Sequence, residues 1–149
     1  MANMRTIWHH VTTLTDDAEI LEVSPRLEIK WFAAPECARS GTPSGGVPAR
    51  SVLVELPAVE GVPVIDARDV AGSLAEIDHD LSDELIEAIQ YDLDKGGWEA
   101  DETAAHLMRE LTGDRGIVLL NWEGDGDEIL IVGRRGLHDA RIIEHLTVA

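Results

Sequence analysis

The stretch from Gly116 to Gly133 constrains the fold of this chain more than any other, because it has the pattern of two strands joined by a tight turn. Two apolar runs, Ile117–Leu120 and Ile129–Val132, flank a Gly-Asp-Gly-Asp segment. Such runs, bounded by residues that tolerate positive φ, predict a β-hairpin. Since strand side chains alternate between two faces, Glu128 would begin the same row as apolar residues of the second run. A carboxylate there is either a solvated strand end or a group at the lip of a cleft.

Strand patterns dominate the first half of the chain. Segments rich in β-branched, aromatic and other apolar residues predict strands at Thr6–Leu14, Leu27–Ala33, Ser51–Leu56 and Val62–Ile65. Between the second and third of these, Pro35 to Arg50 carries three glycines and three prolines. This composition predicts a long loop, and loops of that length in a compact domain tend to be functional or mobile. The final segment, Leu137–Leu146, fits either a short strand or a helix.

Two helices are predicted before the hairpin. Asp80–Leu93 repeats apolar residues at helical spacing, with Asp80 or Ser82 as the N-cap and a Gly-Gly pair as the stop. We expect its inward face to comprise Leu81, Leu85, Ile86, Ile89 and Leu93. A second helix is expected over Asp101–Leu111. Strands, then helices, then a strand pair, without regular βαβ alternation, predict an α+β fold in a single domain spanning residues 1–149.

The charge is strongly acidic, with 29 Asp and Glu against 12 Lys and Arg and a net charge of −17. Such a field repels phosphate backbones and argues against direct nucleic-acid binding, whereas it favours a protein partner with a basic surface. A well-solvated surface explains the charge equally well. One cysteine, Cys37, fits a reducing compartment. Because there is no apolar run long enough to span a membrane and no secretion signal, we expect a cytoplasmic protein.

Metal binding is not expected from the ligand-type residues. The six histidines and Cys37 have no recognised zinc spacing, and the aspartates of the hairpin turn are explained by turn geometry. The adjacent His9 and His10 lie in a predicted strand, so at most one of them enters a core or cleft. The Gly-rich segment within the long loop lacks the Lys-Ser/Thr pair of a phosphate-binding loop.

Three segments, in sequence order, resemble the ADP-ribosyltransferase superfamily. Trp8–Thr13 (Trp-His-His-Val-Thr-Thr), followed by Ala18–Leu21, is similar to the opening Tyr-His-Ile/Val-Thr strand and the turn after it. Ile29–Ala38 is similar to the aromatic strand, commonly Ile-Tyr-Phe-Ala-Asp, and a small helix. Leu111–Asn121 and Asp127–Val132 resemble the last strand pair, whose second strand opens with the catalytic acid. The resemblance implies split, mainly antiparallel sheets with a central helical segment.

In the His-Tyr-Glu branch of that superfamily, the histidine contacts the adenosine ribose of NAD⁺ and the aromatic residue frames the nicotinamide. The acid stabilises the oxocarbenium-like transition state at the nicotinamide ribose. The resemblance therefore implies catalysis by Glu128, with Glu123 in the turn as the competing acid. It implies NAD⁺ binding by His10, Thr12, Trp31, Phe32 and Arg39, where Thr12 or Thr13 supports His10. Trp31 stands where the family has tyrosine, and no Gln-x-Glu or Glu-x-Glu pair is present because position 126 is glycine.

The function implied is a mono-ADP-ribosyltransferase that uses NAD⁺, without a metal, to modify a side chain of a protein target. Within the superfamily, a compact acidic chain is most similar to anti-CRISPR transferases of phages and to intracellular toxin transferases. The alternative, motivated by the charge alone, is a non-enzymatic acidic binding protein such as a nucleic-acid mimic, an immunity protein or an antitoxin. That alternative predicts salt-sensitive binding to one basic partner, indifferent to NAD⁺.

Overall fold

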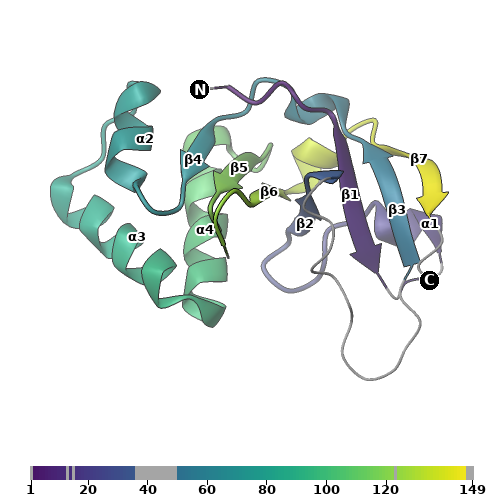
Figure 1. Ribbon diagram of the computed structural model, residues 1–149, viewed down its shortest axis with the longest axis horizontal. Helices are drawn as coiled ribbons and strands as arrows, with labels where there is room; N and C mark the ends of the chain where they lie inside the picture. The colour runs from purple at the N-terminus through teal and green to yellow at the C-terminus, as the bar shows by residue number, and fades with distance from the viewer. Residues whose placement is uncertain (1, 13, 15, 36–49, 123, 147–149) are drawn as a thin grey trace.

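The computed structural model describes residues 2–12, 14, 16–35, 50–122 and 124–146 as an α+β fold (Figure 1). The strands are β1 (Ile7–Thr12), β2 (Lys30–Ala33), β3 (Arg50–Glu55), β4 (Val64–Asp66), β5 (Ile117–Leu120), β6 (Glu128–Val132) and β7 (Arg141–Leu146). The α-helices are α1 (Asp17–Ile20), α2 (Val70–Glu76), α3 (Asp83–Lys95) and α4 (Gly97–Thr112), and two 3-10 helices are η2 (Pro57–Val59) and η3 (Arg134–Leu137). Among the described residues, no helix is both long and apolar enough to cross a membrane.

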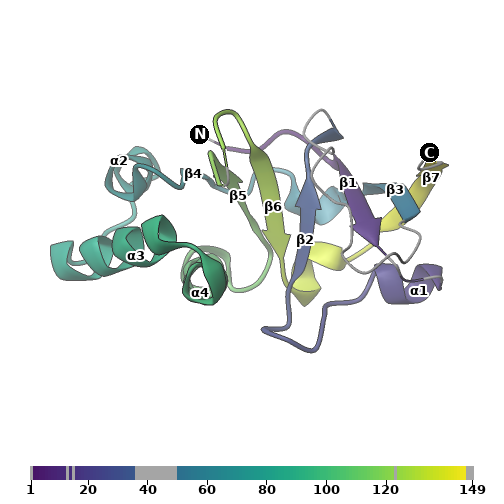
Figure 2. The same ribbon diagram turned by 60° about the horizontal axis from the view of Figure 1, so that its bottom comes forward.

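The seven strands form one sheet in the order β4-β5-β6-β2-β1-β3-β7. Every pairing is antiparallel except β4 with β5, which is parallel because helices α2, α3 and α4 make the crossover between these two strands. The resemblance implied split sheets, whereas hydrogen bonding joins all seven strands. The junction is narrow, however: β1 and β2 share a single registered pair, His9 with Ala33. Figure 2 shows these two strands side by side in the middle of the sheet.

Two apolar clusters cover opposite faces of the sheet. On one face, helices α2, α3 and α4 pack through Leu74, Ala104 and Met108 against strand residues such as Ile117 and Ile131. The other face carries a second buried cluster, which includes Trp8, Phe32, Val54, Leu130 and Val132. The central helical segment therefore lies over the β4-β5-β6-β2 half of the sheet, and Figure 1 shows it at the end of the molecule opposite β3 and β7.

The hairpin and the first strand agree with the sequence pattern. The expected run Ile117–Leu120 is β5, and the second expected run is β6, which begins one residue earlier at Glu128. The second predicted strand, Leu27–Ala33, is too long. Leu27 and Glu28 have φ of 62° and 53°, in the left-handed region, so the extended backbone of β2 begins only at Lys30.

The two long helices are both present, with shifted bounds. Ser82, one of the two expected caps, accepts a hydrogen bond from the Leu85 amide, and α3 therefore begins at Asp83 rather than Asp80. Helix α4 begins at Gly97, four residues before the expected Asp101. The glycine pair does not form a loop, because Gly96 alone separates the two helices. The inward assignment of Leu85 is wrong: its side chain is 46% exposed, whereas Ile89 is buried.

Candidate functional site

His10 lies on β1 beside the narrow junction with β2. Its ring is 5.3 Å from that of Phe32, centroid to centroid, and its Nδ1 is 2.8 Å from the backbone oxygen of Trp31. Burial, reinforced by the charge of Lys30, lowers the pKa of His10 to about 4, although the bond to Trp31 opposes this shift. The ring is therefore neutral near pH 7. Since a carbonyl oxygen only accepts, Nδ1 carries the proton and Nε2 presents its lone pair as an acceptor.

His9, the neighbouring histidine, belongs to the opposite face of β1. It is buried and its Nε2 is hydrogen-bonded to the hydroxyl of Ser51 on β3. Burial lowers the pKa of His9 as well. Because this ring is buried and its Nε2 is already hydrogen-bonded to β3, we take His10 as the candidate ligand-binding histidine.

The aromatic residues of β2 divide between the two faces of the sheet. Phe32 lies under His10 and belongs to the cluster that contains Trp8 and Leu130. Trp31 points to the other face, where it packs against the helical core with its ring 5.4 Å from that of Trp122. The hydrogen bond between Trp31 and His10 is made by the backbone carbonyl of Trp31. The structure thus brings Phe32 together with His10 and places the Trp31 side chain on the opposite face.

Glu128 opens β6 on the same face as His10. The register places Leu130 opposite Phe32, and Glu128 is two residues before Leu130, so its side chain shares that face. Two strand spacings and one row of side chains separate the Cα atoms of His10 and Glu128, which amounts to about 12 Å. The Glu128 carboxylate is 32% exposed and is 3.4 Å from the guanidinium of Arg5.

Arg5 connects Glu128 to the core of this face. Its guanidinium carbon lies 5.6 Å from the centroid of the Trp8 ring, and the Trp8 indole N–H donates to the Arg5 carbonyl at 3.1 Å. A cation held on a buried aromatic ring is a fixed partner for the carboxylate. Arg5 was not among the predicted site residues, since it lies before the first predicted strand and outside the motifs.

Thr12 and Lys30 lie at the other end of the same face. Thr12 is buried, and its hydroxyl accepts a hydrogen bond from the Leu14 amide at 3.0 Å, so it stabilises the end of β1. Lys30 is also buried, and its ammonium donates to the carbonyl of Glu19 at 3.4 Å. Burial lowers the pKa of Lys30, while the charges of Glu22 and Glu19 oppose that shift. Lys30 was not among the predicted site residues, and the signal that could have identified it is a lysine inside an otherwise apolar strand.

The other assignments fall outside the described residues. Glu123, the competing acid, Arg39, Thr13 and Cys37 are not among them, and the same holds for most of the expected long loop between Pro35 and Arg50. Within the described ranges, no group of three histidine, cysteine or acidic residues is arranged to hold a metal ion. Three pockets formed by described residues lie elsewhere, one of them between α3 and α4.

Comparison with known proteins identifies no relative: no family model, no curated protein and no solved structure matches the chain. The geometry places the neutral, oriented imidazole of His10 and the ion-paired carboxylate of Glu128 on one face of the sheet. Between them lies the junction at which β1 and β2 share a single registered pair.

Proposed function

We propose that the protein is a mono-ADP-ribosyltransferase that uses NAD⁺ to modify a side chain of a protein target. The observation that supports it best is the His10 imidazole, neutral and fixed by the Trp31 carbonyl, on the same face as the Glu128 carboxylate. These are two of the three residues that the sequence resemblance names, and they come from strands more than 100 positions apart in the chain.

His10 would bind a ribose hydroxyl of NAD⁺. With its proton on Nδ1 and bonded to Trp31, the ring offers Nε2 as an acceptor for a hydroxyl proton. A neutral ring also suits a reaction that develops positive charge, because an imidazolium would oppose that charge. The low pKa keeps the ring neutral throughout the physiological range.

Glu128 would stabilise the charge that forms when nicotinamide leaves. The bond between the ribose C1′ and the pyridinium nitrogen breaks, its electron pair goes to the nitrogen, and the departing nicotinamide is neutral. The ribose becomes oxocarbenium-like, and a nearby preorganised carboxylate lowers the energy of this cation. A target side chain then attacks C1′ and loses its proton. The Arg5 guanidinium holds the carboxylate in place and also offsets part of its charge.

The nicotinamide ring needs a flat apolar surface. Phe32 lies beneath His10, and the Trp31–Trp122 pair lies on the opposite face of β2. Phe32 is the aromatic residue on the His10–Glu128 face, and at 2% exposed it serves as the floor under His10. The Trp31 ring packs against the helical core on the opposite face, so it does not line this surface.

The direct test is to incubate the protein with NAD⁺ and measure nicotinamide release by chromatography, with biotinylated NAD⁺ and cell lysate in a parallel reaction. We expect release of nicotinamide and transfer of the label to a target protein. An excess of free nicotinamide should suppress both, because it is the leaving group. An absence of both release and transfer with every lysate would exclude the transferase.

The rival function is an acidic binding protein that takes no part in NAD⁺ chemistry. It is favoured by the net charge of −17. It predicts a salt-sensitive complex with a basic partner that forms equally well with and without NAD⁺. A target with a basic surface is expected under both functions, so NAD⁺ dependence is what separates them. An anti-defence or toxin role is a proposal that follows only from the transferase.

A further inference from the structure

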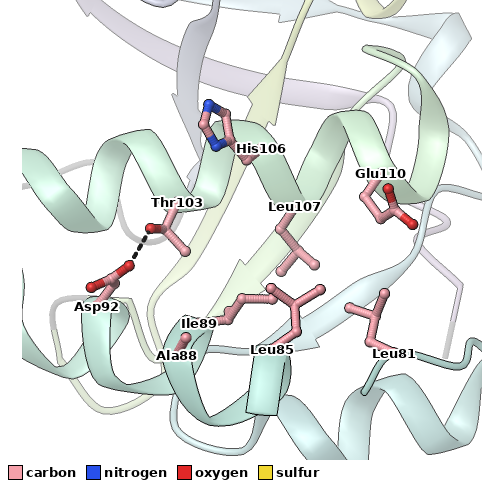
Figure 3. A pocket seen from close by; sticks show the side chains of 9 residues that line it. All are labelled: Leu81, Leu85, Ala88, Ile89, Asp92, Thr103, His106, Leu107 and Glu110. Atoms are coloured by element: carbon pink, nitrogen blue, oxygen red, sulfur yellow. Dashed lines mark hydrogen bonds between the residues drawn. The ribbon is translucent and has the colours of Figure 1, made fainter. Parts of the chain in front are cut away.

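An apolar groove lies between helices α3 and α4, away from the His10–Glu128 face (Figure 3). Its volume is about 320 Å³. Leu81, Leu85 and Ile89 line one side from α3 and the turn before it, and Leu107 of α4 points in from the other side. Leu85 and Ile89 are four residues apart on α3 and so lie on the same side of the helix. Together with Leu81, which precedes the helix, they form an apolar stripe along the groove.

The two ends of the groove are polar. At one end the carboxylate of Asp92 on α3 accepts a hydrogen bond of 2.9 Å from the hydroxyl of Thr103 on α4, which ties the helices together. At the other end lies Glu110 of α4, half-exposed and 3.7 Å from the ring of His79. The stripe is accessible from solvent between these ends, because Leu85 is 46% exposed.

The surrounding helical segment is the most acidic part of the chain. Residues 70–112 contain 12 aspartates and glutamates but only two basic residues, Lys95 and Arg109, which gives a net charge of −10 out of the total of −17. Second copies of so acidic a surface repel one another, whereas a cationic partner is attracted to it.

We propose that this groove binds a cationic amphipathic helix of a protein partner. The groove runs along α3 from Leu81 to its polar end at Asp92, a length of eleven residue steps. At the rise of an α-helix this is about 16 Å, or three turns, and it matches a helix with apolar residues at i, i+4 and i+7. Lysine and arginine on the flanks of that helix would face the acidic rims. The inference stands without the transferase activity, since it uses no residue of the His10–Glu128 face.

The test uses a synthetic amidated peptide of about 14 residues, with leucines at i, i+4 and i+7 and lysine or alanine at the other positions. Binding is measured by titration calorimetry on the whole protein. The comparisons are a peptide of the same composition in shuffled order and one with glutamate in place of each lysine. We expect the lysine peptide to bind at least about tenfold more tightly than either, and more weakly as salt rises.

Two substitutions locate the binding. Leu85→Ser removes an exposed part of the stripe, and Ala88→Arg places a bulky cation on an exposed position that lines the groove. Both should weaken binding at least about tenfold, since each removes an apolar or electrostatic part of the contact. Tyr91→Ser is the matched control, because Tyr91 is a 67% exposed apolar residue of the same helix outside the groove.

Two results would overturn the proposal. The first is equal binding of the ordered and shuffled peptides, or binding that neither Leu85→Ser nor Ala88→Arg weakens. The second is a protein that sediments as a dimer and that Leu85→Ser converts to a monomer, which would assign the groove to a second copy of this chain.

Discussion

The lowered pKa of His10 predicts a pH dependence of folding stability that does not depend on any ligand. Unfolding releases the ring from its buried position and returns its pKa from about 4 to the ordinary value of 6.5. As the pH falls below 6.5, the unfolded chain binds a proton at this ring and the folded chain does not until the pH approaches 4. The free energy of unfolding therefore decreases across that window. Above pH 6.5 the ring is neutral in both states and makes no such contribution.

The size of the effect follows from the two pKa values. Between pH 7.5 and pH 5.5 the loss attributable to His10 is about 1.3 kcal/mol. This loss changes little for any pKa of His10 in the folded state below about 5, because the ring in the folded protein is then mostly neutral at pH 5.5. The lower pH stays above the isoelectric point of about 4.5, where the acidic chain would lose the charge that keeps it in solution.

The measurement is urea unfolding of the parent and of His10→Asn at both pH values. Asparagine keeps a donor for the Trp31 carbonyl but does not titrate. The parent should lose about 1.3 kcal/mol more than the variant over this interval. His138→Asn, at a 79% exposed histidine side chain, controls for the substitution itself. Equal losses in the parent and in His10→Asn would refute the conclusion that the folded ring is held neutral.

Three further substitutions test the packing and the placement of the ligand. Gly136→Ala should destabilise the fold by about 1–3 kcal/mol, since a Cβ there would lie 2.2 Å from the carbonyl oxygen of Arg115. Gly124→Ala, where a Cβ would have no neighbour closer than 3.6 Å, should change the stability little. Denaturant titration measures both, and equal losses of stability would contradict the packing around η3. Trp31→Phe, at a ring on the opposite face of β2, should leave the KM for NAD⁺ within about twofold, measured by nicotinamide release, and a tenfold rise in KM would contradict this placement of the ligand.

The sequence predicted the elements that depend on neighbouring residues. The hairpin runs, the Ser82 cap and the glycine stop of α3 are local signals, and each is found close to its expected place. The α+β fold and its central helical segment followed from the order of these elements. The parallel pairing of β4 with β5 was not predicted, because it joins segments about 50 residues apart that carry no mutual signal.

The errors arose where a side chain's environment depends on distant strands or helices. Leu85 has helical spacing with Ile89, but α4 covers only part of that face of α3, so Leu85 remains at the groove. The alternation of side chains along β2 was evident, yet only the pairing with β1 and β6 shows that Phe32, and not the Trp31 ring, lies beside His10. The Arg5 partner of Glu128 likewise depends on contacts across 123 positions.

The central claim is that Glu128 is the acid that assists nicotinamide release, and a pair of matched variants tests it most directly. Glu128 and Glu55 have side chains equally exposed, at 32%, and each is paired with an arginine, at 3.4 Å and 2.9 Å. Glu128→Gln should lower the kcat of nicotinamide release at least about 100-fold, while Glu55→Gln should stay within about twofold of the parent. Glu123→Gln, measured in the same way, tests the competing acid in the turn. Parent-like release by Glu128→Gln, or an equal loss in Glu55→Gln, would contradict the assignment.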